Sequence, residues 1–228
     1  MRGDAAWVDD HVRRAIDNGY NAFCLTVDTD SYSRRERDIA KRHQRRRVRV
    51  DDARVYQARF NWRDIERIKR ISTIPVLIKG IATAEDAKIA VDHGVDCVYV
   101  SNHGGRQLDQ GVGSIEVLPE VVEAVGGRAR VFVDGSITRG TDVVKAIILG
   151  ADAVVVGRLY VYGLAAAGGK GVFRLFEILE DEIRICLSLL GVTDYGELDK
   201  SYIRAVQPVV PAHVHSPFPH LDLPRETY

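Results

Sequence analysis

This sequence of 228 residues lacks the features that mark disulfide-bonded, membrane-spanning or nucleic-acid-binding proteins. Its three cysteines, Cys24, Cys97 and Cys186, lie far apart inside apolar runs, which excludes a disulfide framework and indicates buried, reduced thiols in a cytosolic setting. No apolar run is long enough to cross a membrane. Lys plus Arg and Asp plus Glu are equal at 32 each, so the formal charge of zero gives no general argument for a nucleic-acid or membrane partner.

The remaining composition is that of a globular protein. The apolar fraction is 46%, and the length allows one sizeable domain, which we predict over 1–228. The polar residues Met1–Asp4 lead directly into a helical pattern, so no signal peptide is expected. Most of the seven prolines lie from Pro208 onward, which predicts an extended C-terminal arm over about 208–228.

Helix ends, glycines and short apolar strands follow one another in a repeating order. Gly19, Gly94 and Gly150 each end an amphipathic segment, where a left-handed C-cap is expected, and an apolar run follows each of them. Because the runs are nearly continuous and rich in β-branched residues, we expect strands of a parallel sheet that are covered on both faces. The predicted strands cover about 22–27, 75–79, 96–101, 130–134 and 152–156.

Helices are predicted between these strands, which indicates an α/β fold. A further long helix is predicted at about 172–190, where apolar residues recur near one face. The predicted N-caps are Asp4 for 5–18, Thr83 in a sequence that resembles a capping box, Ser114 for 115–125, and Thr141 for a helix to Leu149.

The alternatives of a dinucleotide-binding fold and a barrel can be separated by motifs. The glycine-rich fingerprint of a dinucleotide-binding fold is missing. Instead, polar residues end every predicted strand, as in a (β/α)8 barrel enzyme. The groups after the last two strands, Asp134–Ser136 and Gly157–Arg158, suit a phosphate, because small residues allow close backbone approach and Arg adds positive charge. The five groups are Asp28, Lys79, Ser101–His103, Asp134–Ser136 and Gly157–Arg158.

The stretch from Val98 to Asp109 carries the most chemical information. A strand delivers His103 into a Gly-Gly turn, where it suits a general base near neutral pH. Arg106 follows three residues later and suits bidentate binding of a carboxylate, and Asp109 suits an orienting role for the imidazole. The residues leave open the alternative that His103 only caps the strand end by hydrogen bonding.

Residues Ser101–Asp109 resemble the signature of the FMN-dependent 2-hydroxy-acid oxidases and dehydrogenases, which include glycolate oxidase, lactate oxidase and mandelate dehydrogenase. The resemblance extends over nearly the whole chain. It implies a (β/α)8 TIM barrel that is incomplete, with about strands four to eight and their helices present and strands one to three absent. The other matching motifs, in the family's order, are Thr26–Thr29 with Arg34–Glu36, Leu77–Gly80, Asp134–Ser136 with Arg139–Asp142, and Gly157–Arg158.

The resemblance also implies roles for these residues. His103 would take a proton from a 2-hydroxy acid with Asp28 as its support, while Arg106 and Arg35 would bind the carboxylate. Whether the carbon-bound or the hydroxyl proton is taken stays open. Lys79 would stabilise negative charge on reduced FMN, as a fixed cation placed where charge develops. The implied cofactor-binding residues are Thr26, Lys79, Ser101, Asp134, Gly135, Ser136, Arg139, Gly157 and Arg158.

The implied reaction is the FMN-dependent oxidation of a small L-2-hydroxy acid, such as lactate or glycolate, to the 2-oxo acid. Electrons would pass to oxygen or to another acceptor. Members of the family often form homo-oligomers, and the resemblance extends that expectation to this chain. The alternative is a catalytically inactive half-barrel that at most binds FMN or associates with other chains.

Some residues depart from the family's pattern, and others suit a plainer structural role. Ser136 and Thr138 stand where the family often has Gly and Arg, which removes one phosphate contact or replaces it by hydroxyls. Asp28 could instead cap a helix, and Arg158 could be an ordinary surface residue. The basic segment from Arg34 to Arg54 suits a solvated loop better than a nucleic-acid site, and none is expected. His213 and His215 lack a third ligand, so no metal is predicted.

Overall fold

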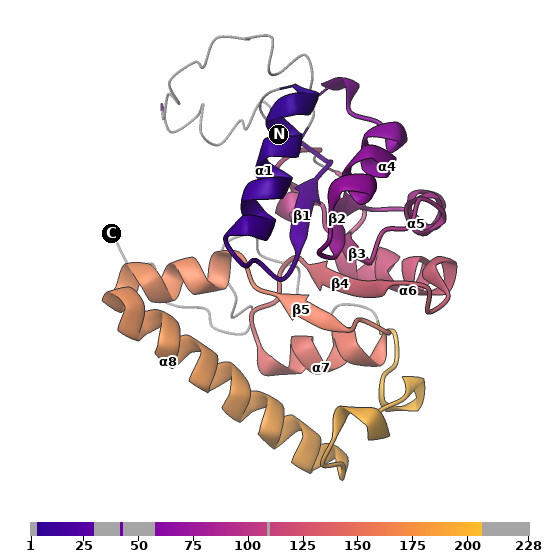
Figure 1. The fold of residues 1–228 in the computed structure, drawn as a ribbon. Helices are drawn as coiled ribbons and strands as arrows, with labels where there is room; N and C mark the ends of the chain where they lie inside the picture. Colours follow the sequence, from indigo (N-terminus) through magenta and orange to yellow (C-terminus); the bar gives the residue numbers. More distant parts are fainter. Residues whose placement is uncertain (1–3, 30–41, 43–57, 109, 207–228) are drawn as a thin grey trace. The chain divides into compact units, whose positions relative to one another are not determined.

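The computed structural model describes residues 4–29, 42, 58–108 and 110–206 (Figure 1). The predicted substrate-binding Arg35, the orienting Asp109 and the arm from Pro208 lie outside the described residues. The chain divides into two compact units. Unit 1 comprises Met1–Gly135 and Leu149–Val155, and unit 2 comprises Ser136–Ile148 and Val156–Tyr228.

Unit 1 is built on a five-stranded parallel sheet with strand order β1-β2-β3-β4-β5. The parallel α/β sheet predicted from the apolar runs is therefore confirmed. Each strand overlaps a predicted range, because short runs of β-branched residues bounded by glycine and polar residues carry a strong local signal. The strands are β1 (Phe23–Thr26), β2 (Val76–Ile81), β3 (Cys97–Val100), β4 (Arg130–Asp134) and β5 (Ala153–Val155).

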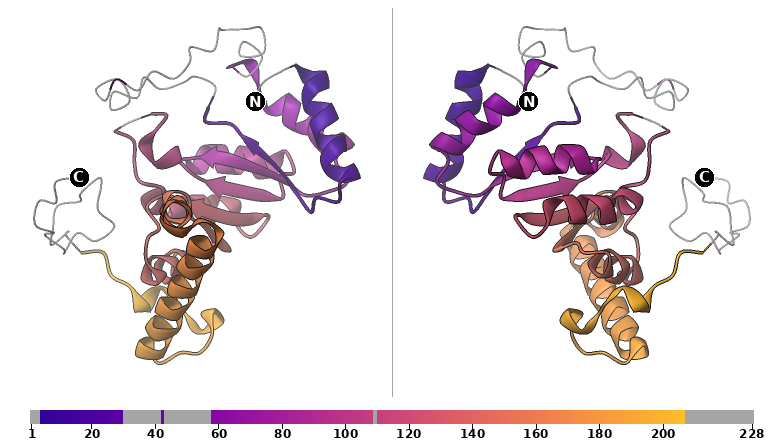
Figure 2. Two further views of the ribbon diagram at one scale, coloured as in Figure 1. Left: turned by 90° about the vertical axis from the view of Figure 1, so that its left-hand side faces the viewer. Right: turned by 90° about the vertical axis from the view of Figure 1, so that its right-hand side faces the viewer.

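The four α-helices of unit 1 whose full extent the structure describes lie on one face of this sheet (Figures 1 and 2). Strands in sequence order that are joined by right-handed crossovers place every connecting helix on the same side. Side chains facing these helices, such as Ile78 and Val98, are fully buried. The helices are α1 (Ala5–Asp17), α4 (Trp62–Ile71), α5 (Ala84–Asp92) and α6 (Ser114–Val125).

The opposite face of the sheet corrects one prediction. Among the described residues of unit 1, no helix lies on this face. Cys97 and Tyr99, whose side chains lie on it, are nevertheless only 4% and 7% exposed, so β3 is buried on both faces as predicted. Side chains alternate along a strand, so Cys24 lies on this face and is exposed, whereas all three cysteines were predicted to be buried. Cys97 is buried and Cys186 is half-buried, and all three are free thiols.

Two of the predicted helix caps are confirmed and two are wrong. Asp4 accepts a hydrogen bond from the Trp7 backbone N–H at 2.9 Å, and Thr83 accepts one from that of Asp86 at 3.1 Å. Helix α6 instead begins at Ser114 itself, after Gly113 as N-cap. The remaining helix begins at Gly140, before Thr141, where Asp142 accepts hydrogen bonds from two preceding backbone N–H groups. Both helices thus begin earlier than predicted, so Ser114 and Thr141 lie inside them.

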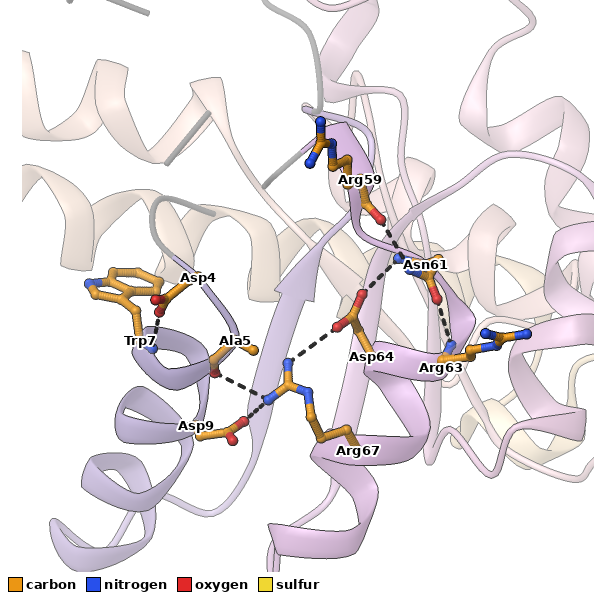
Figure 3. Close-up of polar contacts among 9 residues, drawn as sticks. All are labelled: Asp4, Ala5, Trp7, Asp9, Arg59, Asn61, Arg63, Asp64 and Arg67. Atoms are coloured by element: carbon orange, nitrogen blue, oxygen red, sulfur yellow. Dashed lines mark hydrogen bonds and ion pairs between the residues drawn. The ribbon is translucent and has the colours of Figure 1, made fainter. Parts of the chain in front are cut away.

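Helices α1 and α4 are joined by Arg67, whose guanidinium lies between two carboxylates (Figure 3). It forms ion pairs with Asp9 on α1 and Asp64 on α4, and donates to the carbonyl of Ala5 at 3.1 Å. Asp64 also accepts from the backbone N–H of Asn61 and completes a capping box at the start of α4. One side chain therefore links the first helix to the sheet's helical layer.

Unit 2 contains α7 (Gly140–Ile148), α8 (Arg158–Leu190) and two short 3-10 helices, η2 (Tyr195–Glu197) and η3 (Lys200–Tyr202). Helix α8 starts earlier than the predicted 172–190 and is interrupted at Ala167 and Gly168, whose backbone angles are not helical. Glu182 of α8 holds the start of α7, accepting from the Gly140 backbone N–H at 2.7 Å and from Arg139 at 2.8 Å. In the described part of the chain, no helix is both long and apolar enough to span a membrane.

Candidate active site

The carboxyl ends of the first four strands bring most of the predicted site residues of unit 1 to one edge of the sheet. Thr26 pairs with Lys79 and Lys79 with Tyr99 across adjacent strands, so these three side chains lie side by side on the face without helices. Asp134 ends β4, two residues after Phe132, which pairs with Tyr99. The strand register therefore gathers groups that are more than a hundred residues apart in the sequence.

Lys79 is the centre of a buried polar cluster. Its Nζ donates to the Ser101 Oγ at 2.5 Å, lies 3.1 Å from the Asp134 Oδ2, and stands 4.9 Å from the centre of the Tyr99 ring. Only 17% of the Lys79 side chain and 16% of the Asp134 side chain are exposed. A buried ammonium is costly unless it is paired and hydrogen-bonded, and these three neighbours meet that requirement.

His103 forms the second polar cluster with Asp28. The imidazole Nδ1 lies 2.6 Å from the Asp28 Oδ2, and 32% of the His103 side chain is exposed. Because a carboxylate only accepts hydrogen bonds, this contact places a proton on Nδ1 and leaves the Nε2 of a neutral ring with its lone pair. The arrangement therefore suits a base held in one orientation by a carboxylate.

The turn after β3 holds His103 in an unusual backbone conformation. Its φ is +53°, a left-handed value that costs a non-glycine residue about 1–3 kcal/mol. The Ser101 Oγ accepts from the His103 backbone N–H at 3.2 Å, and the Asn102 side-chain oxygen accepts from the Gly104 backbone N–H at 2.9 Å. Ser101, which is 1% exposed, thus contacts both Lys79 and the turn that carries His103.

Gly80 makes room for Asp28. It follows Lys79 at a break in the β2–β3 register and has a φ of +110°. A Cβ at this position would lie 2.6 Å from the Asp28 Cγ, closer than atoms can pack. The carboxylate that holds His103 therefore occupies the space that the missing side chain of Gly80 leaves.

Two buried carboxylate oxygens at this edge have unused hydrogen-bonding capacity. Within the described residues, the Asp134 Oδ1 and the Asp28 Oδ1 accept no hydrogen bond. Buried polar atoms in native proteins nearly always have partners, so these acceptors are ready for donors of a bound molecule. FMN fits this requirement, because its ribityl chain carries hydroxyl donors. Gly135, with a φ of +111°, follows Asp134, and a Cβ at this position would lie 3.0 Å from the Ser114 Oγ.

The remaining predicted site residues are Thr26, which is the cross-strand neighbour of Lys79, and several residues later in the chain. Thr26 is half-buried at the end of β1, and Arg106 is exposed directly after the 3-10 helix η1 (His103–Gly105). Arg139 forms an ion pair with Glu182 at 2.6 Å. In unit 2, Ser136, Gly157 and Arg158 are exposed, and Gly157 and Arg158 begin α8.

Tyr99 is a residue of this site to which the sequence analysis assigned no role. Its hydroxyl donates to the Asp134 Oδ2 at 3.0 Å, and the residue is 7% exposed. Burial, followed by the negative charge of Asp134, raises the pKa of the Tyr99 phenol well above its usual range. The alternation of β3 contained the signal, because Tyr99 stands two residues before Ser101 on the same face.

Comparisons with known proteins show the family to which this chain is related. Residues 1–205 match the family model described as FMN-dependent dehydrogenase. The chain is 41% identical over 212 residues to the peroxisomal (S)-2-hydroxyacid oxidase GLO3 of Arabidopsis thaliana, covering 85% of this chain and 58% of that protein. It is 36% identical over 215 residues to the L-lactate oxidase of a Nostoc species, covering 84% and 59%.

Solved structures give the same result. A crystal structure of mandelate oxidase matches with a TM-score of 0.77 and 42% sequence identity, covering 86% of this chain and 60% of that chain. The chain thus spans about three fifths of the length of the relatives that it matches. Because some relatives carry names that place them in peroxisomes, the cytosolic setting stays a prediction.

Proposed function

Because the chain belongs to the family of FMN-dependent dehydrogenases, we propose that it serves the FMN-dependent oxidation of an L-2-hydroxy acid to the 2-oxo acid. The observation that carries the proposal is the His103–Asp28 pair at 2.6 Å, at the sheet edge that also holds Lys79. The named activities of the relatives, on (S)-2-hydroxy acids, lactate and mandelate, indicate the substrate class.

In this proposal His103 is the base. The Nε2 lone pair accepts a proton from C2 or from the hydroxyl of the substrate, and the ring becomes an imidazolium. Asp28 stabilises that cation and keeps the ring oriented, as a carboxylate does beside a catalytic histidine. A positioned base of this kind contributes roughly 10²–10⁴-fold to the rate.

Arg106 is proposed to bind the substrate carboxylate. Its side chain is exposed directly after η1, at the turn that also carries His103. A planar guanidinium binds a carboxylate through two parallel hydrogen bonds, which fixes the orientation of C2 and its hydroxyl. Arg35, outside the described residues, is proposed as a second partner of this carboxylate.

The cofactor would be held by the acceptors and donors at the same edge. We propose that Thr26, Lys79, Ser101, Asp134 and Gly135 contact FMN, which, when bound, accepts the two electrons of the substrate and passes them to oxygen or another acceptor. Lys79 adds a fixed positive charge where negative charge develops. Ser136, Gly157 and Arg158 remain proposed cofactor contacts. Arg139 is already paired with Glu182, which favours a structural role for it.

We further propose that the five strands correspond to strands four to eight of a (β/α)8 barrel. The parallel order and the similarity to three fifths of mandelate oxidase support this assignment. In the described sheet, β1 and β5 each have a strand on one side only. That observation favours a second candidate, a half-barrel that binds FMN but needs further strands for turnover.

The test is an anaerobic flavin titration. The purified chain is mixed with FMN, and the visible spectrum is recorded before and after addition of L-lactate, glycolate or (S)-mandelate. Bleaching of the flavin band in the wild-type chain, and its absence in His103→Ala, supports the proposed reaction. His93→Ala is the matched control, because His93 forms a similar pair with Glu66 at 3.0 Å away from this edge. Bound flavin that no substrate bleaches supports the second candidate, and absence of FMN binding refutes both.

A further inference from the structure

Tyr99 contacts both of the opposite charges in the Lys79 cluster. Its hydroxyl donates to the Asp134 Oδ2 at 3.0 Å, and the Lys79 Nζ lies 4.9 Å from the centre of its ring. Phe132 meets the Tyr99 ring edge to face, with ring centres 6.2 Å apart and an interplanar angle of 65°. The ring is thus held from the side and has little freedom to move.

The hydroxyl and the ring act on different partners. The Asp134 Oδ2 accepts from both Tyr99 and Lys79, so the phenol takes up part of the hydrogen-bonding capacity of this carboxylate. The ring attracts the ammonium through its electron-rich face and does not neutralise it. Because burial and the charge of Asp134 raise the pKa of the phenol, it remains a neutral donor throughout the physiological range.

We infer that Tyr99 is a positioning residue of the flavin site, which holds Asp134 and Lys79 in place and preserves the positive charge of Lys79 for the bound cofactor. This inference rests on the proposed function. The Lys79 ammonium has three N–H donors, of which Ser101 and Asp134 take two within the described residues. The third donor has no partner in the described part of the chain and is available to a ligand.

Removal of the hydroxyl alone has a defined consequence. In Tyr99→Phe the ring remains, but Asp134 loses its neutral donor and pairs more completely with Lys79. The field of the ammonium at a bound flavin then weakens, so we expect the affinity for FMN to fall about tenfold. If the affinity for reduced FMN falls tenfold more than the affinity for oxidised FMN, the two-electron potential of the bound flavin falls by about 30 mV.

The first arm of the test requires no flavin. A double-mutant cycle with Tyr99→Phe and Asp134→Asn is measured by urea unfolding, and we expect the two changes to be coupled by at least fivefold in the unfolding constant. Tyr20→Phe, at an exposed tyrosine, is the matched control and should show no coupling with Asp134→Asn. Additive effects of Tyr99→Phe and Asp134→Asn would overturn the inference.

The second arm measures the dissociation constant and the potential of bound FMN. Weaker binding and a lower potential in Tyr99→Phe, with no change in Tyr20→Phe, support the inference. If Tyr99→Phe does not fold, Asp134→Asn decides the question, because loss of the carboxylate charge should instead raise the potential. Unchanged binding and potential in a folded Tyr99→Phe chain overturn the inference alone. A wild-type chain that binds no FMN overturns the proposed function as well.

Discussion

Substitution of Gly80 by Ala should disable the proposed base His103 indirectly, by displacing Asp28. The added Cβ would lie 2.6 Å from the Asp28 Cγ and 2.7 Å from its Oδ1, so Asp28 has to move. The contact between the Asp28 Oδ2 and the His103 Nδ1, now 2.6 Å, would then lengthen or break. His103 would lose the partner that sets its orientation and tautomer.

The magnitude follows from two separate costs. The φ of +110° at Gly80 strains any residue with a Cβ, by about 1–2 kcal/mol for left-handed conformations. The forced contact with Asp28 adds about 1–3 kcal/mol, as for other overpacked sites. A displacement of about 1 Å in a catalytic group can lower the rate about 10²-fold, and we expect a loss of that order in flavin reduction.

The assay compares Gly80→Ala with Gly19→Ala. Gly19 has a φ of +73° but nothing within 4 Å of an added Cβ, so its variant carries the strain without the clash. Urea unfolding and anaerobic flavin reduction are measured for both variants. In an Asp28→Ala background, Gly80→Ala should cost little further activity, because its effect acts through Asp28. Flavin reduction in Gly80→Ala at the rate of Gly19→Ala would refute the reasoning.

Three further predictions concern stability and thiol reactivity. In Glu182, burial acts to raise the pKa, but hydrogen bonds from Arg139 and Gly140 outweigh it and hold the pKa of the carboxyl below its usual value. The ionised carboxylate therefore stabilises the fold above pH 4–5, and this contribution is lost as the pH falls through the lowered pKa. Glu182→Gln should cost about 1–3 kcal/mol at pH 7 in urea unfolding, with the gap closing below about pH 4, and a constant gap would contradict this. Arg67→Met should cost about 1–3 kcal/mol, because it leaves two carboxylates without their cation, whereas Arg63→Met at an exposed site of the same helix should change little. Equal effects of these two substitutions would argue against the bridging role in Figure 3. Burial, followed by Cys24, raises the pKa of the Cys97 thiol to about 12, so native Cys97 should resist iodoacetamide at pH 8 and react only after unfolding, as mass spectrometry of the alkylated chain can establish.

Much of the fold was predictable from local patterns. Runs such as Cys97–Val100 and Arg130–Asp134 form strands because β-branched and apolar residues recur there between glycines and polar residues. Asp4 and Thr83 cap helices because a short acceptor side chain reaches backbone donors only a few residues away. The predictions at Ser114 and Thr141 were wrong because both residues lie inside their helices, which begin at Ser114 and Gly140. Glu116 and Asp142 accept from the backbone N–H groups of Gly113 and Arg139 just before these helices.

By itself, the sequence determined the parallel α/β class, the strand positions and, through the Ser101–Asp109 motif, the resemblance to a flavoprotein family. The tertiary structure alone decided which residues meet. Lys79, Tyr99 and Asp134 lie on three strands, and their contacts depend on strand order and register, which no local pattern encodes. The same holds for Gly80, whose missing side chain makes space for Asp28 more than fifty residues earlier. Close packing between distant segments sets such positions, because it depends on the positions of all neighbouring elements at once.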